Sequence, residues 1–455
     1  MKSHVLLARL QSGKPLSIGE QTSLAWLLAL PSIISQLITI LMEYVDTAMV
    51  GQLGAQASAS IGLITTTTWL MSGVCSALSS GFSVLVAHSV GAQNLERTRQ
   101  ILRQAIVFML IVSCVIGLIG IIISSRLPHW LGGDSTVCGD ATAYFFVYSL
   151  SMPLWAMNFL MAAMLRSSGN TRIPSVVNVL CCVLNIGFNY LLIFVFGLGV
   201  LGAAIGTACA ITVSVIVLVV YVVFYSEELS LHNTSGTYRM QSEIIYPALH
   251  IGLPIALQQV VFTSAQIVST LMIAPLGTRA IAAHSFGITI EGLCYMPGFG
   301  IGDSATTLIG QSVGAKRSEL KRSFALITMG MGIGVMTVLG LFMFFGVSYL
   351  MPLMTPDLEV QAMTVEVLRI EAFAEPLYAA SIVAYGIFVG LGDTKIPSLM
   401  NLMSIWLVRL PLAYFLINTF GLKGFWIAMC TELCFRGLIF SVRLMIKIRV
   451  NNESN

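Results

Sequence analysis

Residues 30–51 read Leu-Pro-Ser-Ile-Ile-Ser-Gln-Leu-Ile-Thr-Ile-Leu-Met-Glu-Tyr-Val-Asp-Thr-Ala-Met-Val-Gly. The apolar run that contains most of them, residues 23–50, exceeds the roughly 20 residues that a helix needs to cross a bilayer core. Pro31 frees backbone groups that need other partners, and the acids Glu43 and Asp46 are costly to place in lipid. The stretch therefore predicts a membrane-spanning helix in which Asp46 marks a functional site, with both acids lying in headgroup water as the alternative.

Composition supports a membrane protein. The chain has 455 residues, of which 56% are hydrophobic and 9% are charged, whereas a soluble domain has about 25% charged residues. The long apolar runs do not alternate in polarity as barrel strands do, which favours helices. The net charge of +3 gives no reason to expect a nucleic-acid partner. Nine cysteines lie mostly in the apolar runs, where we expect them to pack rather than form disulfides.

The apolar runs predict an all-α polytopic membrane protein with about twelve transmembrane helices. The longest polar stretch separates two groups of six. We therefore expect an N-terminal six-helix lobe (1–225), a cytoplasmic linker (226–244) and a C-terminal six-helix lobe (245–455). The expected spans are 23–50, 58–86, 101–125, 143–164, 174–196, 198–224, 246–274, 280–309, 323–350, 368–390, 397–419 and 421–445.

An internal repeat relates the two halves. Pro31 and Pro254 are 223 positions apart (254 − 31), and several loop motifs recur with the same offset. Two like bundles of six helices are typical of secondary transporters, in which one bundle rocks against the other. The alternative is a repeat kept only for packing, as in a channel or scaffold. The recurring motifs are residues 89–92 with 312–315, and 169–175 with 392–398.

Basic residues gather in alternate loops. Arg97, Arg99 and Arg103 follow the second span. The loops of the opposite side hold little more than Arg126, Arg279 and Lys423. The positive-inside rule then places both termini in the cytoplasm and Asp46 in the outer half of its helix. We expect a multi-pass protein of the cell (inner) membrane.

Polar residues of the first half form a candidate ion site. Asn185 and Asn189 are one helical turn apart in the fifth span, and Thr207 in the sixth could approach them. Together with Asp46 they offer hard oxygens and one titratable group, which suits Na⁺ or H⁺. The alternative for the asparagines is ordinary hydrogen bonding between helices. We expect no other metal, and no cofactor.

Other polar side chains in the spans are candidates for a substrate cavity. Glu43 lies on the helix face of Gln36, and Glu291 and Asp303 lie twelve positions apart (303 − 291) in the eighth span. Twelve positions are about 18 Å of helix, so the last two cannot form one tight site, and structural pairing is their alternative. Methionines can line an adaptable cavity or fill a core. The candidates are Gln36, Glu43, Gln258, Gln259, Met272, Glu291 and Asp303.

Five further acids and bases are expected to pair structurally. Glu371 and Glu375 lie near Arg369 in the sequence, and we expect these three to form a satisfied network. Arg409 and Glu432 fall in the last two spans, and we expect them to pair with each other.

Several of these motifs resemble those of the multidrug and toxic compound extrusion (MATE) family. The resemblance rests on residues 45–51 (Val-Asp-Thr-Ala-Met-Val-Gly), on the paired Val-Gly-Ala motifs, and on the paired Gly-(Asn/Asp)-Thr-(Arg/Lys)-Ile-Pro loops, and it covers about residues 20–445. It implies two six-helix lobes that export organic, often cationic, compounds in exchange for Na⁺ or H⁺. It also implies that the first helix can bend at Pro31.

Within the family, the resemblance is closer to the DinF-type branch, whose essential first-span Asp matches Asp46. Asn185 and Thr207 match polar members of the same cavity, whereas Asn189 stands where related sites often have a second Asp. The NorM-type branch has a seventh-span Glu, and that position here is Phe262.

The sequence thus predicts a secondary antiporter for small organic molecules, functional as a monomer, with the bilayer as its surroundings. A lipid-linked oligosaccharide flippase of the same superfamily is the alternative, although its pyrophosphate would call for more basic residues in the spans. We do not expect an enzyme, because no cluster of His, Cys or acids falls at one depth apart from Glu43 and Asp46. A pure scaffold would not need a buried Asp46.

Overall fold

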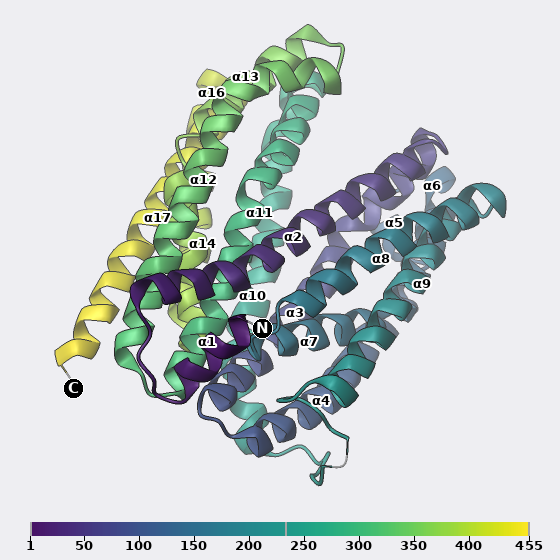
Figure 1. The fold of residues 1–455 in the computed structure, drawn as a ribbon. Coiled ribbons are helices and arrows are strands. Elements are labelled where there is room, and N and C mark those ends of the chain that lie inside the picture. Colours follow the sequence, from purple (N-terminus) through teal and green to yellow (C-terminus); the bar gives the residue numbers. More distant parts are fainter. Residues whose placement is uncertain (1, 233, 454–455) are drawn as a thin grey trace. The chain divides into compact units, whose positions relative to one another are not determined.

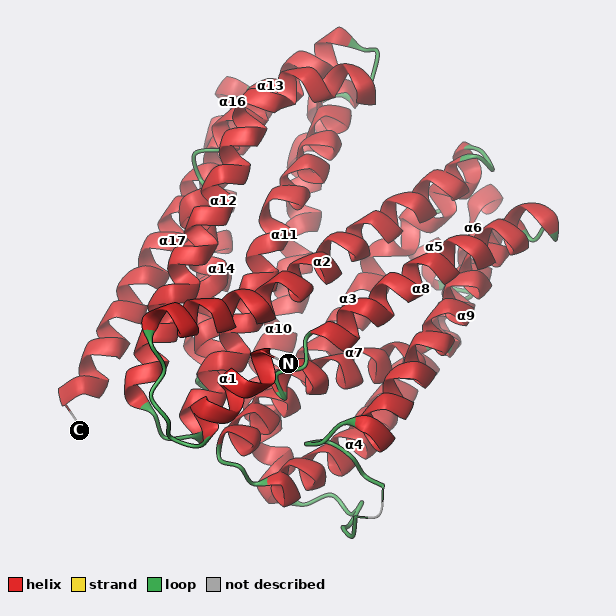
Figure 2. Cartoon of the chain, viewed as in Figure 1, coloured by secondary structure: helices red, strands yellow, loops and turns green. Residues whose placement is uncertain are grey.

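The computed structural model describes residues 2–232 and 234–453, and within them it contains helices and loops but no strands (Figures 1 and 2). The elements are α1 (Lys2–Gln11), α2 (Ile18–Gly51), α3 (Ala55–Gly91), α4 (Leu95–Ile123), α5 (Leu127–Trp130), α6 (Ser135–Leu150), α7 (Met152–Ser167), α8 (Arg172–Tyr190), η1 (Leu191–Val195), α9 (Gly199–Val220), η2 (Tyr221–Tyr225), α10 (Ser242–Ile273), η3 (Ala274–Leu276), α11 (Thr278–Gly314), α12 (Ser318–Met354), α13 (Leu358–Glu371), α14 (Glu375–Gly390), α15 (Lys395–Met403), η4 (Ser404–Arg409), α16 (Leu410–Phe420) and α17 (Leu422–Glu453).

The repeat seen in the sequence extends to the backbone. Helices α3 and α11 begin 223 positions apart (278 − 55), and the same offset separates the starts of α4 and α12, α6 and α13, α7 and α14, α8 and α15, and α9 and α17. Gly54 and Gly277 precede α3 and α11 with φ of 109° and 96°, a conformation that favours glycine. Gln93 and Lys316 both have φ of 56°. Equivalent turns of the two halves therefore share unusual backbone angles.

The chain forms two compact units. Unit 1 comprises Met1–Gln36 and Val260–Asn455, and unit 2 comprises Leu37–Gln259. The boundaries fall inside α2 and α10, again 223 positions apart (259 − 36). Each unit therefore includes part of a proline-bearing helix that begins in the other half of the sequence. The division into lobes at 226–244 stays a prediction.

Unit 2 packs its helices around an apolar core. Phe82, Leu102 and Leu160, from α3, α4 and α7, are almost completely buried in it. At Gly81 a Cβ atom would collide with the backbone of Ala248, so α3 and α10 approach more closely than larger side chains would permit. Small residues at such contacts are a general device of membrane helices, which cannot rely on the hydrophobic effect to associate.

Unit 1 has a core of its own. Phe425 and Trp426 of α17 are buried against side chains of α11, α12 and α13. Helix α1 packs onto this unit through the buried Leu7 and Leu10. Gln11 donates from Nε2 to Oε1 of Gln311 in α11 at 3.2 Å.

Many helices are suited to a bilayer. Nine helices in the described part of the chain are long and apolar enough to cross a membrane, or up to eleven when each of two bent pairs is counted as one span. The bent pairs, α6 with α7 (49°) and α13 with α14 (59°), are equivalent in the repeat. Helix α11 has 37 residues but is not one of these apolar helices. A total of twelve spans therefore stays a prediction.

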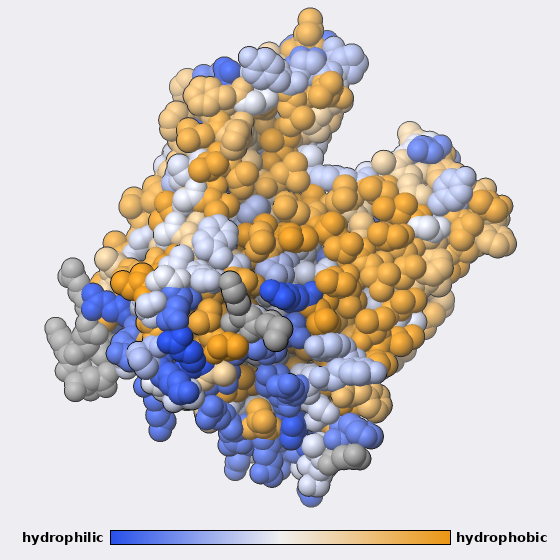
Figure 3. Space-filling model, in the orientation of Figure 1, coloured by the Kyte–Doolittle hydropathy of each residue, from blue (hydrophilic) through white to orange (hydrophobic). Residues whose placement is uncertain are grey.

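The apolar surface follows these helices. In unit 2, Leu110, Val115 and Ile122 of α4 expose a third or more of their side chains, although all are aliphatic. On the face seen in Figure 3, apolar side chains cover α8 and α9, and polar side chains gather near α1. Surfaces of this kind are stable against lipid and not against water. The chain is a multi-pass membrane protein.

Candidate functional site

A chain of hydrogen bonds connects three helices of unit 2 around Asp46. Asn189 of α8 donates from Nδ2 to Oδ1 of Asp46 in α2 at 2.8 Å, and to Oδ1 of Asn185 at 3.3 Å. Asn185 in turn donates from Nδ2 to Oγ1 of Thr207 in α9 at 3.0 Å. The structure thus brings together all four residues of the predicted ion site.

The site is closed on one side. Asn185 and Asn189 are 0% exposed, whereas Asp46 is half-buried. Met49 follows Asp46 by three positions, and Ile193 follows Asn189 by four. Both side chains belong to one buried apolar cluster of unit 2. The buried Oδ1 atom of Asn189 has no hydrogen-bond partner in the described part of the chain. Since a buried acceptor without a partner costs free energy, this oxygen is suited to receive a ligand.

Close packing between α8 and α9 fixes the position of Asn189. A Cβ atom at Gly206 of α9 would overlap the Asn189 side chain, and one at Gly202 would lie 2.7 Å from the backbone of Leu192. Glycines at these two positions let α8 and α9 approach along one face. The π-helical turn η1 follows Asn189 almost directly, and such turns often occur at functional sites.

The donor set can hold a proton or a hard cation. It contains the carboxylate of Asp46, two amide oxygens and a hydroxyl, all of them hard oxygen ligands. No group of three or more His, Cys, Asp or Glu residues suited to a metal ion occurs in the described residues. With one carboxylate, the arrangement is suited to a singly charged ion rather than to a multivalent metal.

Sequence reasoning missed two residues next to this site. Gly206 contacts Asn189, and Tyr144 of α6 is close enough to Asp46 to interact with it electrostatically. The spacing of Gly202 and Gly206, four positions apart on one helix face, could have indicated the close contact. Nothing in the sequence around Tyr144 distinguishes it from other aromatic residues in the spans.

The first helix carries the other predicted residues of this region. Pro31 lies inside α2, which continues past it to Gly51. Glu43 lies one turn before Asp46 and is exposed on the surface of the protein, and its carbonyl accepts a hydrogen bond from Thr47 Oγ1 at 2.8 Å. A further contact joins the two helices of the site, because Asn178 of α8 donates from Nδ2 to Oγ1 of Thr39 at 3.0 Å.

The substrate-cavity candidates are divided between the two units, and their grouping around one cavity stays a prediction. In unit 2, Gln259 lies over Gly73, and Oε1 of Gln258 is buried without a hydrogen-bond partner in the described residues. In unit 1, Met272 packs against an apolar cluster that includes Ile405. The candidates of unit 1 are Gln36, Met272, Glu291 and Asp303, and those of unit 2 are Glu43, Gln258 and Gln259.

Unit 1 contains a buried network of charges. Arg409 donates from Nη2 to Oε2 of Glu432 at 2.6 Å, which confirms the predicted pair. Nε of Arg436 lies 3.1 Å from the other oxygen of Glu432, and Ser404 donates to the same carboxylate. Glu291 is 5% exposed and interacts electrostatically with both arginines. The position of Glu291 agrees with the alternative hypothesis, in which this acid pairs with neighbouring charges rather than lining a substrate cavity.

The predicted network of Glu371, Glu375 and Arg369 is wrong. Arg369 donates instead to Ser348 and to the carbonyl of Phe344, and the carboxylates of Glu371 and Glu375 are buried without hydrogen-bond partners among the described residues. Residues two positions apart on a helix point in nearly opposite directions, so Arg369 and Glu371 lie on different faces of α13.

Comparison with known proteins identifies the family. The MatE family model matches residues 31–191 and 254–415, two segments that begin 223 positions apart (254 − 31). A probable multidrug resistance protein NorM of Thermotoga maritima is 28% identical over 425 residues, covering 90% of this chain and 89% of the relative. A protein of the same description from Idiomarina loihiensis is 28% identical over 449 residues, covering 94% of each chain.

Solved structures show the same fold. A mutant of the Vibrio cholerae MATE transporter VcmN has a TM-score of 0.89 and 22% identity, with 95% of this chain and 98% of that chain covered. An outward-facing multidrug resistance MATE family transporter of the MOP superfamily has a TM-score of 0.89 and 19% identity, with 95% and 97% covered. Because the family model matches most of the chain, the protein belongs to the MatE family of multidrug efflux transporters.

Proposed function

We propose that the chain is a secondary antiporter that exports small organic, often cationic, compounds in exchange for H⁺ or Na⁺ bound at Asp46. The observation that carries the proposal is the hydrogen-bonded chain from Asp46 through Asn189 and Asn185 to Thr207. An acid in a membrane-spanning helix is expensive unless it serves a function or a partner. Its partners here are neutral amides, so the negative charge is left for an arriving cation.

In the proposed cycle the ion enters from the outside and neutralises Asp46. The amide groups of Asn189 and Asn185 then reorient, since Nδ2 of Asn189 loses the charged acceptor that holds it. Helix α2 repacks or bends at Pro31, where the backbone lacks one hydrogen bond. Substrate is released outward and the loaded carrier resets. Such coupling requires that ion and substrate prefer different conformations.

We place the chain nearer the DinF-type branch than the NorM-type branch. The support is the acid in the first helix together with Phe262 where a seventh-span acid is expected. Two six-helix lobes (1–225 and 245–455) joined by a cytoplasmic linker, termini in the cytoplasm, and action as a monomer complete the proposal. The offset of 223 positions between equivalent helices supports the two lobes.

Efflux from everted vesicles or dye-loaded cells tests the proposal. A Na⁺ gradient and a pH gradient are imposed separately on wild type, on Asp46→Asn and on Asp140→Asn, which removes an exposed acid of unit 2. One gradient should drive efflux in wild type and in the Asp140 variant, and Asp46→Asn should lose that response while folding normally. A folded Asp46→Asn protein that still responds fully to the gradient contradicts the assignment of Asp46.

The flippase alternative is not favoured. The buried arginines Arg409 and Arg436 are already occupied by Glu432, which leaves them poorly placed to receive a pyrophosphate. A drug-susceptibility assay in an efflux-deficient host separates the two functions, because only the antiporter should raise the tolerated concentration of organic cations.

A further inference from the structure

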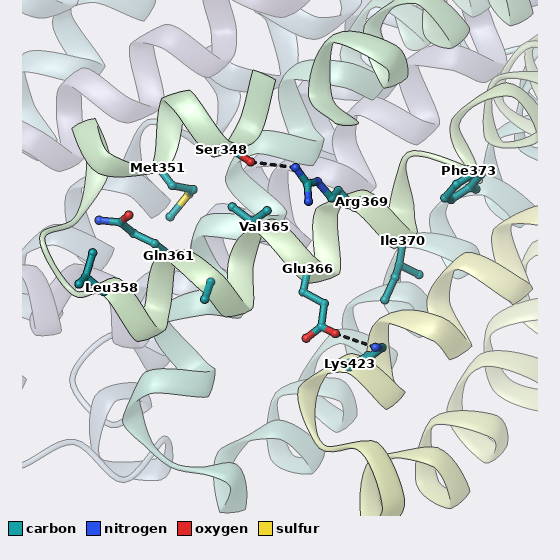
Figure 4. Close-up of a pocket in the computed structure, with 11 residues that line it drawn as sticks. Ser348, Met351, Leu358, Gln361, Val365, Glu366, Arg369, Ile370, Phe373 and Lys423 are labelled. Carbon is teal, nitrogen blue, oxygen red and sulfur yellow. Dashed lines mark hydrogen bonds and ion pairs between the residues drawn. The ribbon is translucent and has the colours of Figure 1, made fainter. Parts of the chain in front are cut away.

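A pocket of about 610 Å³ lies at one end of unit 1. It is formed by the last turns of α12, by α13 and by the start of α17 (Figure 4). Its lining combines apolar side chains with Ser348, Glu366, Arg369 and Lys423. None of these residues belongs to the ion site, which lies in unit 2.

Arg369 is held in a defined position in this pocket. Its Nη2 donates to Oγ of Ser348 at 3.0 Å and its Nε donates to the carbonyl of Phe344 at 3.4 Å. The guanidinium also lies 5.6 Å from the centre of the Phe344 ring. Arg369 makes no ion pair with any residue that the structure describes. A guanidinium has five N–H donors, so Arg369 presents an uncompensated charge with donors to spare.

Lys423 adds a second cation that is partly neutralised. Its Nζ lies 2.6 Å from Oε1 of Glu366, and both side chains are about half exposed. Figure 4 shows Glu366 directed toward Lys423, and Arg369 directed toward Ser348. Two bases and one acid leave the pocket with a net positive charge, which favours an anion.

The pocket lies at the depth of lipid headgroups. Ser348 follows Phe324, the first residue of the apolar run of α12, by 24 positions (348 − 324), or about 36 Å of helix. The hydrocarbon core of a bilayer is about 30 Å thick, so the last turns of α12 reach the interface. Arginine at the interface can hold a phosphate while apolar neighbours remain in lipid.

Apolar side chains surround the charged centre. Tyr349 and Leu353 of α12 are 82% and 84% exposed, Leu358 of α13 is 76% exposed, and Phe373, in the turn after α13, is 71% exposed. Within the pocket the apolar surface continues through residues such as Val365 and Ile370. A ligand that matches both surfaces has an anionic head and an apolar tail.

We propose that this pocket binds the headgroup of an anionic phospholipid, with its phosphate at Arg369 and Lys423 and its acyl chains along the exposed side chains of α12 and α13. A guanidinium binds phosphate with two parallel hydrogen bonds, and Ser348 keeps the Arg369 side chain oriented for this contact. With both termini in the cytoplasm, as proposed above, the lipid belongs to the outer leaflet.

Native mass spectrometry of the full-length protein in mixed micelles tests the site. Phosphatidylglycerol and phosphatidylcholine with identical acyl chains are offered in equal amounts to wild type, Arg369→Ala, Arg369→Lys and Arg126→Ala. Arg126 is an exposed base of unit 2 outside the pocket, so its variant controls for the loss of one positive charge. Competition with inorganic phosphate distinguishes a lipid site from one for a soluble anion.

Wild type and Arg126→Ala should retain phosphatidylglycerol in preference to phosphatidylcholine. Arg369→Ala should lose roughly fivefold in phosphatidylglycerol retention, the effect of one basic residue near an anionic lipid, and Arg369→Lys should lose less. Equal retention of the two lipids by wild type overturns the proposal. So does an equal loss in the Arg126 and Arg369 variants, or displacement of the lipid by millimolar inorganic phosphate. Measurement of the melting temperature of each variant shows whether a loss reflects unfolding, and Arg369→Lys then decides the case.

Discussion

Asn189 and Asp46, 143 positions apart in the sequence, are joined by a hydrogen bond of 2.8 Å between Nδ2 and Oδ1. An amide nitrogen can only donate, so this carboxylate oxygen acts as the acceptor. Asn189 thus connects the acid in α2 to α8. The same Nδ2 also donates to Asn185 of α8, which in turn donates to Thr207 of α9. Occupation of Asp46 by an ion thus changes the first bond of a chain of hydrogen bonds that runs from α2 through α8 to α9.

Removal of the Asn189 amide should weaken the response to the coupling ion. A hydrogen bond to a charged group contributes about 1.5–3 kcal/mol, so we expect Asn189→Ala to change the ion concentration for half-maximal efflux by roughly tenfold or more. Asn189→Asp should instead make efflux depend more steeply on pH, since it adds a titratable group. Dye efflux at graded pH and Na⁺ measures both effects.

Asn418→Ala is the control for these variants. Asn418 is an exposed residue of α16, and its amide donates to the local carbonyl of Tyr414. Efflux that follows the same ion dependence in Asn189→Ala as in Asn418→Ala is incompatible with a role of Asn189 in ion binding.

A methyl group at Gly206 should disturb the ion site. A Cβ atom at this position overlaps the side chain of Asn189, so Ala can fit only when Asn189 shifts from the position in which it donates to Asp46. We therefore expect Gly206→Ala to lose most ion-driven efflux. Gly187→Ala in the neighbouring helix α8 meets no atom within 4 Å and should remain active, with a stability gain of up to about 1 kcal/mol from helix propensity. Efflux assays with melting temperatures compare the two, and an active Gly206→Ala protein contradicts the proposed packing constraint.

Substitutions of different members of the buried charge network in unit 1 should destabilise the protein to different extents. Glu432 lies between Arg409 and Arg436, so Glu432→Gln leaves two buried cations without their acid and should destabilise the protein by about 3–5 kcal/mol. Arg409→Met leaves Glu432 paired with Arg436 and should cost less. Thermal unfolding in detergent measures the difference.

The exposed acid Glu359 provides a reference for that experiment. It pairs with Arg279, but both side chains are more than half exposed, so Glu359→Gln should cost less than about 1 kcal/mol. A melting temperature of Glu432→Gln close to that of Glu359→Gln means that the network contributes little to stability.

Asp393 should make the stability of the folded protein depend on pH in the acidic range. Burial alone would raise the pKa of this loop carboxyl, but Lys447 and Arg443 together hold the pKa below its ordinary value of 3.8. A lowered folded-state pKa stabilises the protein above the unfolded-state pKa, and that contribution is lost as pH falls through the folded-state value. The contribution of Asp393 to the melting temperature should thus be constant from pH 7 to pH 5. At pH values below about 4 this contribution should decrease.

Asp393→Asn isolates this effect. It removes the ion pairs with Arg443 and Lys447, so the variant should melt at a lower temperature than wild type at pH 7, and the two curves should converge in acid. Asp140→Asn, at an exposed position, should follow wild type throughout. A difference between wild type and Asp393→Asn that stays constant into strong acid contradicts the ion-pair explanation.

The repeat shows which structural features can be predicted from the sequence and which cannot. The motifs at 169–175 and 392–398 predict equivalent turns, and Gly169 and Gly392 indeed have φ of 97° and 76°. The partners of the next residue differ, because Asn170 donates from Nδ2 to the hydroxyl of Tyr221 whereas Asp393 pairs with two bases of α17. A local motif specifies a turn, and the side chains that meet it come from distant segments.

Hydropathy and the repeat determined that this protein is a helical membrane protein built from two related halves. Those features depend on neighbouring residues, because a helix satisfies its own backbone hydrogen bonds and a span needs only enough consecutive apolar residues. They also pointed to Asp46, since an acid in such a run is costly wherever the helix packs.

Only the tertiary structure decided which groups meet. The amide of Asn189 reaches Asp46 because Gly206 lets α8 and α9 pack closely, and Arg369 turns to Ser348 rather than to Glu371 because it lies on the other face of α13. Such contacts depend on the rotation and approach of whole helices, which many residues together set. No short stretch of sequence contains that information.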